Sequence, residues 1–244
     1  MPAFRGAQDV VDQGTPLEDR WGGWYVTGTA GSLRHRGNAV AHDRQRPKEL
    51  DPHNSQNLTS LDRKFDVSPY LEPTSDIVAL MTMEHQTKMT NLFTRFGWEA
   101  RIAVADGKQA AFEPRLAFGV EEIVNYMLFA DEAPIRDPIQ GNSTFTKTFP
   151  QHGPRDKAGR SLRDFDLHKR LFRYPLSYMI YSETFDQLPD LLRDGVYRKL
   201  FAVLTGADHG ARFASLSAED RRNALAILLE TKANLPDYWR EARP

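Results

Sequence analysis

The chain has 244 residues, and its 32 Lys and Arg nearly balance its 33 Asp and Glu, for a formal net charge of −1 at pH 7. This balance provides no global positive field, so neither nucleic acid nor an anionic membrane is expected as a partner. No apolar run approaches the roughly 20 residues that a membrane-spanning helix needs. The absence of cysteine excludes disulfides, a thiolate nucleophile and covalent c-type haem attachment through Cys-x-x-Cys-His.

The N-terminal third, residues 1–73, is predicted to be irregular. Pro and Gly recur without a sustained period, although Trp24–Thr27 is expected to form one short strand. The polar run 43–57 is expected to be an exposed loop. Because so long a structureless segment is unusual in a compact domain, we expect it to wrap a helical body or a partner.

The tract Arg20–Asn38 stands out within this region, with two Trp, one Tyr, five Gly, three Arg and one His in nineteen residues. Dense glycines permit tight turns and close approach, and indole rings bury large areas while keeping a polar group. No phosphate, metal or nucleophile pattern lies within the tract. We therefore interpret it as a packing element, with Trp21 and Trp24 as candidate partner contacts.

The first predicted helix begins near Thr74 and runs to about Val104. Pro73 precedes it, Thr74 or Ser75 is expected to cap it, and Asp76 favours its first turn. Apolar residues then recur at helical spacing and define one face. The members of this face are Ile77, Met81, His85, Met89, Leu92, Phe96 and Ala100.

Four further helices are predicted. They are Leu116–Phe129, a helix opened by Pro175, Leu188–Leu204 closed by Gly206, and Ser217–Leu229, in which Ser217 and Asp220 form a variant capping box. A long connection, Asp131–Tyr174, separates the first two of these. The expected fold is mostly α, a single multi-helical domain of residues 74–244 that follows the irregular segment 1–73.

Glu84 and His85 lie in the middle of the first helix, and His85 shares its face with methionines four residues away on each side. One interpretation is a metal or haem site, to which His35 would contribute, because imidazole and carboxylate are ligands for iron and other metals. The other is a core histidine with one nitrogen bonded to a neighbour. His42, His53, His152, His168 and His209 are expected to be ordinary surface residues.

Two arginine clusters are candidates for partner binding. Arg34 and Arg36 flank His35 and favour an anionic partner, unless they simply form a basic surface turn. Arg155, Arg160 and Arg163 alternate with aspartates in the long connection. That alternation predicts either an ion-pair network within the loop or a docking surface for another protein.

Four segments together resemble the C-terminal part of a group of bacterial proteins similar to exported c-type cytochromes. The segments are Arg20–Asn38, Thr74–Arg95, Gly153–Leu167 and Leu171–Pro189. In that group a region with Cys-x-x-Cys-His precedes the helical part. The resemblance implies a periplasmic, redox-associated context. Because this chain lacks cysteine, the haem is expected on a partner or an upstream domain, whether the chain is a fragment or a stand-alone version.

The expected function is a non-catalytic helical module that associates with a periplasmic c-type cytochrome or a larger electron-transfer complex. Two alternatives remain at this point. The chain is an oxidoreductase with its own metal or haem site around Glu84, His85 and His35, or it is a structural subunit of a large assembly. Met1–Asp9 contains no hydrophobic signal segment, so any export signal is expected to have been removed or to belong to a longer precursor.

Overall fold

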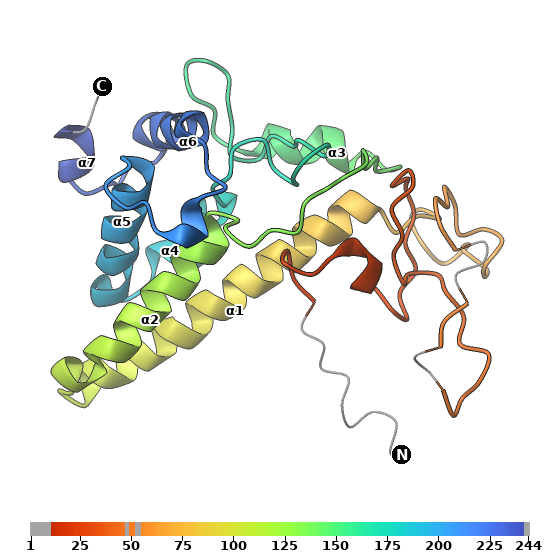
Figure 1. Ribbon diagram of the computed structural model, residues 1–244, viewed down its shortest axis with the longest axis horizontal. Helices are drawn as coiled ribbons and strands as arrows, with labels where there is room; N and C mark the ends of the chain where they lie inside the picture. The colour runs from red at the N-terminus through yellow and green to blue at the C-terminus, as the bar shows by residue number, and fades with distance from the viewer. Residues whose placement is uncertain (1–10, 47–48, 52–54, 242–244) are drawn as a thin grey trace. The chain divides into compact units, whose positions relative to one another are not determined.

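The computed structural model describes residues 11–46, 49–51 and 55–241, and within these ranges its regular structure is helical (Figure 1). This confirms the mostly α prediction. The α-helices are α1 (Ile77–Ala105), α2 (Gln109–Met127), α3 (Phe145–Thr148), α4 (Glu183–Asp186), α5 (Asp190–Leu204), α6 (Ala218–Thr231) and α7 (Tyr238–Glu241). Short 3-10 turns are η2 (Leu17–Asp19), η3 (Phe149–His152), η4 (Tyr178–Tyr181) and η5 (Ala211–Phe213).

The chain forms two compact units whose boundary falls within α1. Unit 1 comprises Met1–His85, Glu132–Phe149 and Phe165–Leu171, and unit 2 comprises Gln86–Asp131, Pro150–Asp164 and Phe172–Pro244. Residues 47–48 and 52–54 of the predicted loop, His53 among them, lie outside the described residues, as do residues 1–10 and 242–244. The proposed domain boundary between residues 73 and 74 stays a prediction.

The predicted apolar face of the first helix is confirmed. All seven of its members are buried, and His85, Met89 and Ala100 have no exposed surface. The helix begins at Ile77 rather than near Thr74, and neither Thr74 nor Ser75 caps it. Asp76 does so instead, because its Oδ1 accepts hydrogen bonds from the N–H groups of Val78 and Ala79 at 2.8 and 3.1 Å.

In unit 2, α2 runs antiparallel beside the second part of α1 (Figure 1). The turn between them contains Gly107, whose φ of +67° favours glycine. Phe96 and Phe118 pack edge to face across the pair, and Arg115 forms a bidentate ion pair with Glu99. The helix α2 begins at Gln109 rather than at Leu116, and it accommodates Pro114 on its exposed side.

The predictions of a helix closed by Gly206 and of a capping box at Ser217 are confirmed, whereas the prediction of a helix opened by Pro175 is wrong. Gly206 follows α5 with a φ of +78°, and Ser217 and Asp220 form the capping box of α6. Pro175, however, opens no helix: the chain stays irregular until η4 at Tyr178. The N–H of Ser177 donates to the carbonyl of Met127 at 2.8 Å, so a long-range hydrogen bond holds this segment outside a helix.

The irregular character predicted for residues 1–73 is confirmed for the described part of that range, where the helical structure is the short turn η2. The predicted strand Trp24–Thr27 is wrong. Its backbone bonds to a side chain instead of a neighbouring strand: the N–H of Val26 donates to Asn38 Oδ1, and Asn38 Nδ2 donates to the carbonyl of Val26. Within the described ranges, strand-type pairing is limited to isolated bridges, among them those that join Thr27 to Asp76, Thr29 to Gln140, and Val40 to Asp51.

Asp76 connects three segments of unit 1. Besides capping α1, its Oδ2 accepts hydrogen bonds from the N–H and the hydroxyl of Ser143, both at 2.8 Å. The residue after it, Ile77, donates its N–H to the carbonyl of Thr27 at 2.8 Å. The aspartate is buried, so its carboxylate oxygens depend on the donors of Val78, Ala79 and Ser143 rather than on water.

The substitution Asp76→Ala is expected to destabilise the protein by about 3 kcal/mol, because it removes the acceptor of four buried or half-buried donors. Urea unfolding monitored by circular dichroism measures this loss. The exposed Asp62→Ala serves as the control and should change the unfolding free energy by less than about 0.5 kcal/mol. Equal stability of the two variants would contradict the assigned role of Asp76.

Candidate functional site

The sequence-predicted pair Glu84 and His85 belongs to a buried polar cluster of unit 1. His85 Nδ1 lies 2.7 Å from Gln13 Oε1, and the main-chain carbonyl of Gln13 accepts a hydrogen bond from Arg20 Nη2. Arg20 Nη1 in turn lies 3.1 Å from Glu84 Oε2. The cluster therefore joins α1 to the start of the irregular segment through side chains that the sequence separates by more than sixty residues.

These contacts suit a structural histidine better than a metal or haem ligand. Burial lowers the pKa of His85 to about 3, so the ring is neutral, and Gln13 orients it. Burial also raises the pKa of Glu84, against the opposing charge of Arg20. A guanidinium beside the carboxylate disfavours a cation there. Among the described residues, no group of three His, Cys, Asp or Glu is placed to hold a metal ion.

The ring of His35 packs against the ring of Trp21. The two rings meet edge to face with centroids 5.6 Å apart, and both residues are about 5% exposed. Burial, opposed by the Gly37 backbone and aided by the charge of Arg34, lowers the pKa of His35 to about 4. Arg34 and Arg36 are exposed, and Arg36 pairs with Asp19 at 2.5 Å.

Another carboxyl in unit 1, that of Glu132, was not singled out by the sequence. Its Oε1 accepts a hydrogen bond from the N–H of Leu171 at 2.9 Å. Burial raises its pKa to about 7, although that hydrogen bond and the charges of Arg170 and Arg20 oppose the rise. Glu132 falls where a helix ends and a loop begins, and no local pattern there distinguishes a buried glutamate from a solvated one.

Arginines of the second cluster, in unit 2, are largely occupied by contacts within that unit. Arg155 bonds to Asp164 and to the carbonyls of Gly159 and Pro150, and Arg160 pairs with the buried Asp156 at 2.7 Å. The guanidinium of Arg163 lies over the ring of Tyr178. The alternation of Arg and Asp thus forms the ion-pair network that was one of its two predicted meanings.

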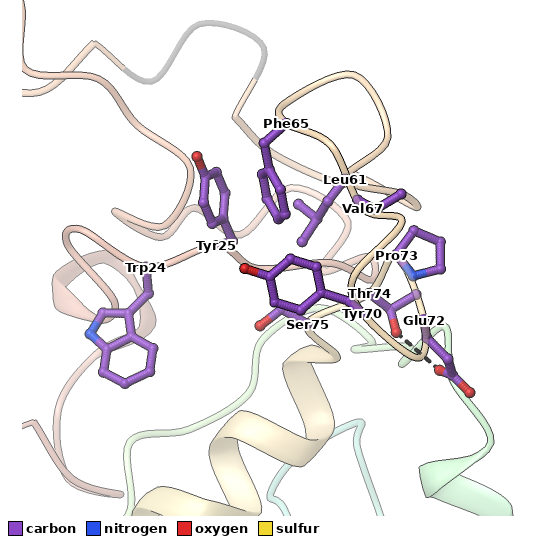
Figure 2. Close-up of a pocket in the computed structure, with 10 residues that line it drawn as sticks. All are labelled: Trp24, Tyr25, Leu61, Phe65, Val67, Tyr70, Glu72, Pro73, Thr74 and Ser75. Carbon is purple, nitrogen blue, oxygen red and sulfur yellow. Dashed lines mark hydrogen bonds between the residues drawn. The ribbon is translucent and has the colours of Figure 1, made fainter.

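An open groove with a volume of about 360 Å³ lies on unit 1 (Figure 2). The residues that line it are Trp24, Tyr25, Leu61, Phe65, Val67, Tyr70, Glu72, Pro73, Thr74 and Ser75. Four of them are aromatic, and Trp24 and Tyr70 are 61% and 63% exposed. We call this surface the aromatic groove. Exposed aromatic side chains at this density are typical of binding surfaces rather than of ordinary solvated loops.

The rings of the aromatic groove form a nearly continuous surface. Tyr25 and Phe65 have centroids 4.9 Å apart, and Phe65 and Tyr70 have centroids 5.6 Å apart. Figure 2 shows these three rings in the middle of the groove, with Trp24 on one side and Glu72 on the other. Glu72 accepts a hydrogen bond from the Thr74 hydroxyl at 3.1 Å. The groove is therefore elongated, with an indole at one end and a carboxylate at the other.

Of the sequence-predicted partner contacts, Trp24 alone lines the aromatic groove; the lining residues from Leu61 to Ser75 were not singled out. The signal that points to them is the segment Phe65–Pro73, in which two aromatic residues, a leucine and two prolines occur in an otherwise polar, irregular region. Apolar residues without a helical or strand period have no obvious internal core to enter. Such a pattern indicates a local cluster at the surface.

Comparison with family models, with curated proteins and with solved structures found no match. Among the described residues, no helix is both long and apolar enough to cross a membrane. The chemistry of the aromatic groove therefore carries the functional argument.

The substitution Glu132→Gln is expected to stabilise the protein above pH 7. The pKa of Glu132 lies near 7 in the folded chain and near 4.5 in the unfolded one. Its contribution to the free energy of unfolding is therefore fully present below pH 4.5 and is lost as the pH rises through 7. At pH 8 the variant should gain about 2–3 kcal/mol over the natural chain, and at pH 4 little. Urea unfolding at both pH values measures this, and an equal change at both would contradict it.

His85 makes the opposite contribution. Its pKa is about 3 in the folded chain against 6.5 unfolded, so stability is lost as the pH falls below about 6.5. In His85→Gln, the loss of unfolding free energy between pH 6 and 4 should be shallower by about 1.4 kcal/mol per pH unit. The exposed His168→Gln, measured over the same range, should keep the slope of the natural chain.

Proposed function

We propose that this protein is a non-catalytic binding module whose docking surface is the aromatic groove. The observation that carries the proposal is the gathering of exposed aromatic rings around one open groove in a unit that is otherwise tightly bonded. Trp24, Tyr25 and Tyr70 are all more than two-fifths exposed and line the same surface. Aromatic residues are enriched at protein interfaces because they bury a large area and lose little conformational entropy.

The buried groups support a binding role over a catalytic one. His85 is bonded to Gln13 and Glu84 is paired with Arg20, so both have structural partners. Glu72 lines the aromatic groove, but the remaining lining residues comprise no histidine, lysine or second carboxylate among the described side chains. Among these lining residues, candidates for proton transfer are thus limited to Glu72 and the hydroxyls of Tyr25 and Tyr70, while the apolar contact area that binding needs is present.

For the partner, we propose a c-type cytochrome or a larger periplasmic electron-transfer complex. The support is the resemblance of Arg20–Asn38 and three later segments to a region that follows a haem-bearing part in similar bacterial proteins. Arg20–Asn38 supplies Trp24 and Tyr25 to the aromatic groove. In this proposal the haem belongs to the partner or to an upstream domain, and the chain contributes recognition.

The chain, immobilised and incubated with the periplasmic fraction of its source organism, is expected to retain a c-type cytochrome, identified by covalent haem staining and Soret absorbance. The purified chain alone should show no Soret band. In Trp24→Ala, retention should fall by about tenfold or more, as expected for an aromatic anchor at an interface.

Trp98→Ala is the matched control, because Trp98 is 64% exposed on α1 of unit 2 and does not line the groove. Its retention should equal that of the natural chain. If no haem protein binds above background, or if the two tryptophan variants bind equally well, the proposed function is wrong.

A further inference from the structure

We propose that the aromatic groove binds an extended, proline-containing segment of its protein partner that carries a lysine or arginine. This proposal rests on the proposed function and adds the chemistry of the contact. In it, proline rings lie on the rings of Tyr25, Phe65 and Tyr70, and the basic side chain lies at Glu72. The argument has three steps, which concern the shape of the groove, the kind of contact it offers, and its charge.

The shape of the groove favours an extended ligand over a caged one. The ring of Phe65 is in direct contact with the rings of Tyr25 and Tyr70, at centroid distances of 4.9 and 5.6 Å, so these rings do not stand apart as the walls of a cage around a small cation. A ligand must lie across their outer faces. Because Trp24 and Glu72 lie on opposite sides of these rings, an extended chain can contact all three parts of the groove (Figure 2).

The groove offers rings rather than a backbone edge. In the described part of the segment that forms it, residues 61–75, there is no strand to which a peptide could add. Side-chain contact must therefore provide the affinity. Proline suits such a surface because its compact apolar ring packs on aromatic faces, and because a polyproline II segment is already extended before it binds and so loses little entropy.

The charge of the groove specifies a basic residue in that segment. Of the ten described residues that line the groove, Glu72 alone carries an ionisable carboxyl, and no lysine or arginine is among them. The nearby Arg63 and Lys64 are exposed but do not line it. A cation at Glu72 gains both a carboxylate partner and attraction to the faces of neighbouring aromatic rings. An acidic segment would gain neither.

The test uses the full chain and a blocked nonapeptide of eight prolines with one arginine near one end. Titration followed by nuclear magnetic resonance is expected to show saturable binding, with the largest shift among the four indole N–H signals at Trp24. Trp24→Ala and Tyr70→Ala should each weaken binding about tenfold, whereas Trp98→Ala should leave it unchanged.

The role of Glu72 is tested by comparing the affinities of the groove for a basic and for an acidic peptide. Replacing the arginine of the peptide by glutamate should weaken binding to the natural chain about fivefold. In Glu72→Gln that preference should nearly vanish, while the affinity for an all-proline peptide stays the same. Circular dichroism is the control for folding. Each variant is expected to be folded, because Trp24, Tyr70 and Glu72 are exposed.

The inference is overturned if the peptide does not bind, if a glycine–serine peptide of equal length binds equally well, or if binding is unchanged in Trp24→Ala. Its failure is distinguishable from that of the proposed function. If the chain retains a cytochrome in a Trp24-dependent way but does not bind the peptide, the proposed function stands and the proline-rich contact is wrong. If the chain binds the peptide but no cytochrome, the proline-rich contact stands and the proposed partner is wrong.

Discussion

The structure of unit 1 depends on the buried carboxylate of Asp76. Its four hydrogen bonds hold the first turn of α1 and the segment at Ser143, and the adjacent Ile77 holds Thr27. A region without strands and with little helix must satisfy its backbone groups some other way. Here short polar side chains take that role. Asn38 bonds to both backbone groups of Val26, and Asn57 accepts from the N–H of Ala30.

Glycines complete this arrangement where two backbones approach closely. A Cβ at Gly28 would lie 2.6 Å from the carbonyl oxygen of Gln140, and its φ of +118° is unfavourable for other residues. A Cβ at Gly141 would lie 2.5 Å from Asp76 Oδ2. The density of glycine in Arg20–Asn38 thus reflects packing around fixed hydrogen bonds rather than a flexible loop. A rigid base of this kind can present side chains to solvent in a defined arrangement.

The sequence predictions are correct where an element depends on residues close together in the chain, and wrong where it depends on distant ones. The apolar face of α1 and the capping box at Ser217 depend on residues three or four positions apart, so the chain itself carries the signal. The failures at Trp24–Thr27 and Pro175 have a common cause. Asn38 bonds to Val26, and Met127 accepts from Ser177, which are long-range hydrogen bonds that no local pattern specifies.

The candidate site shows the same division. Trp24 was identifiable because tryptophan in a glycine-rich tract is unusual. Its neighbours Phe65 and Tyr70 come from a separate segment, and their meeting with Tyr25 depends on how residues 55–75 fold back. The half-buried position of Glu132 likewise results from long-range packing against Leu171. Sequence reasoning therefore found one end of the aromatic groove and could not assemble the rest.

Trp21 and Trp24 both belong to the tract Arg20–Asn38, but one is buried and the other exposed. The backbone between them explains this difference. The N–H of Trp24 donates to the carbonyl of Trp21 at 3.0 Å, and Gly23 between them has a φ of +87°. This is a tight turn with a glycine at the position that needs a positive φ. The chain reverses between the two indoles, so Trp21 packs on His35 while Trp24 remains in solvent. The pair of glycines thus separates a buried tryptophan, which anchors the tract, from an exposed one, which lines the aromatic groove together with Tyr25.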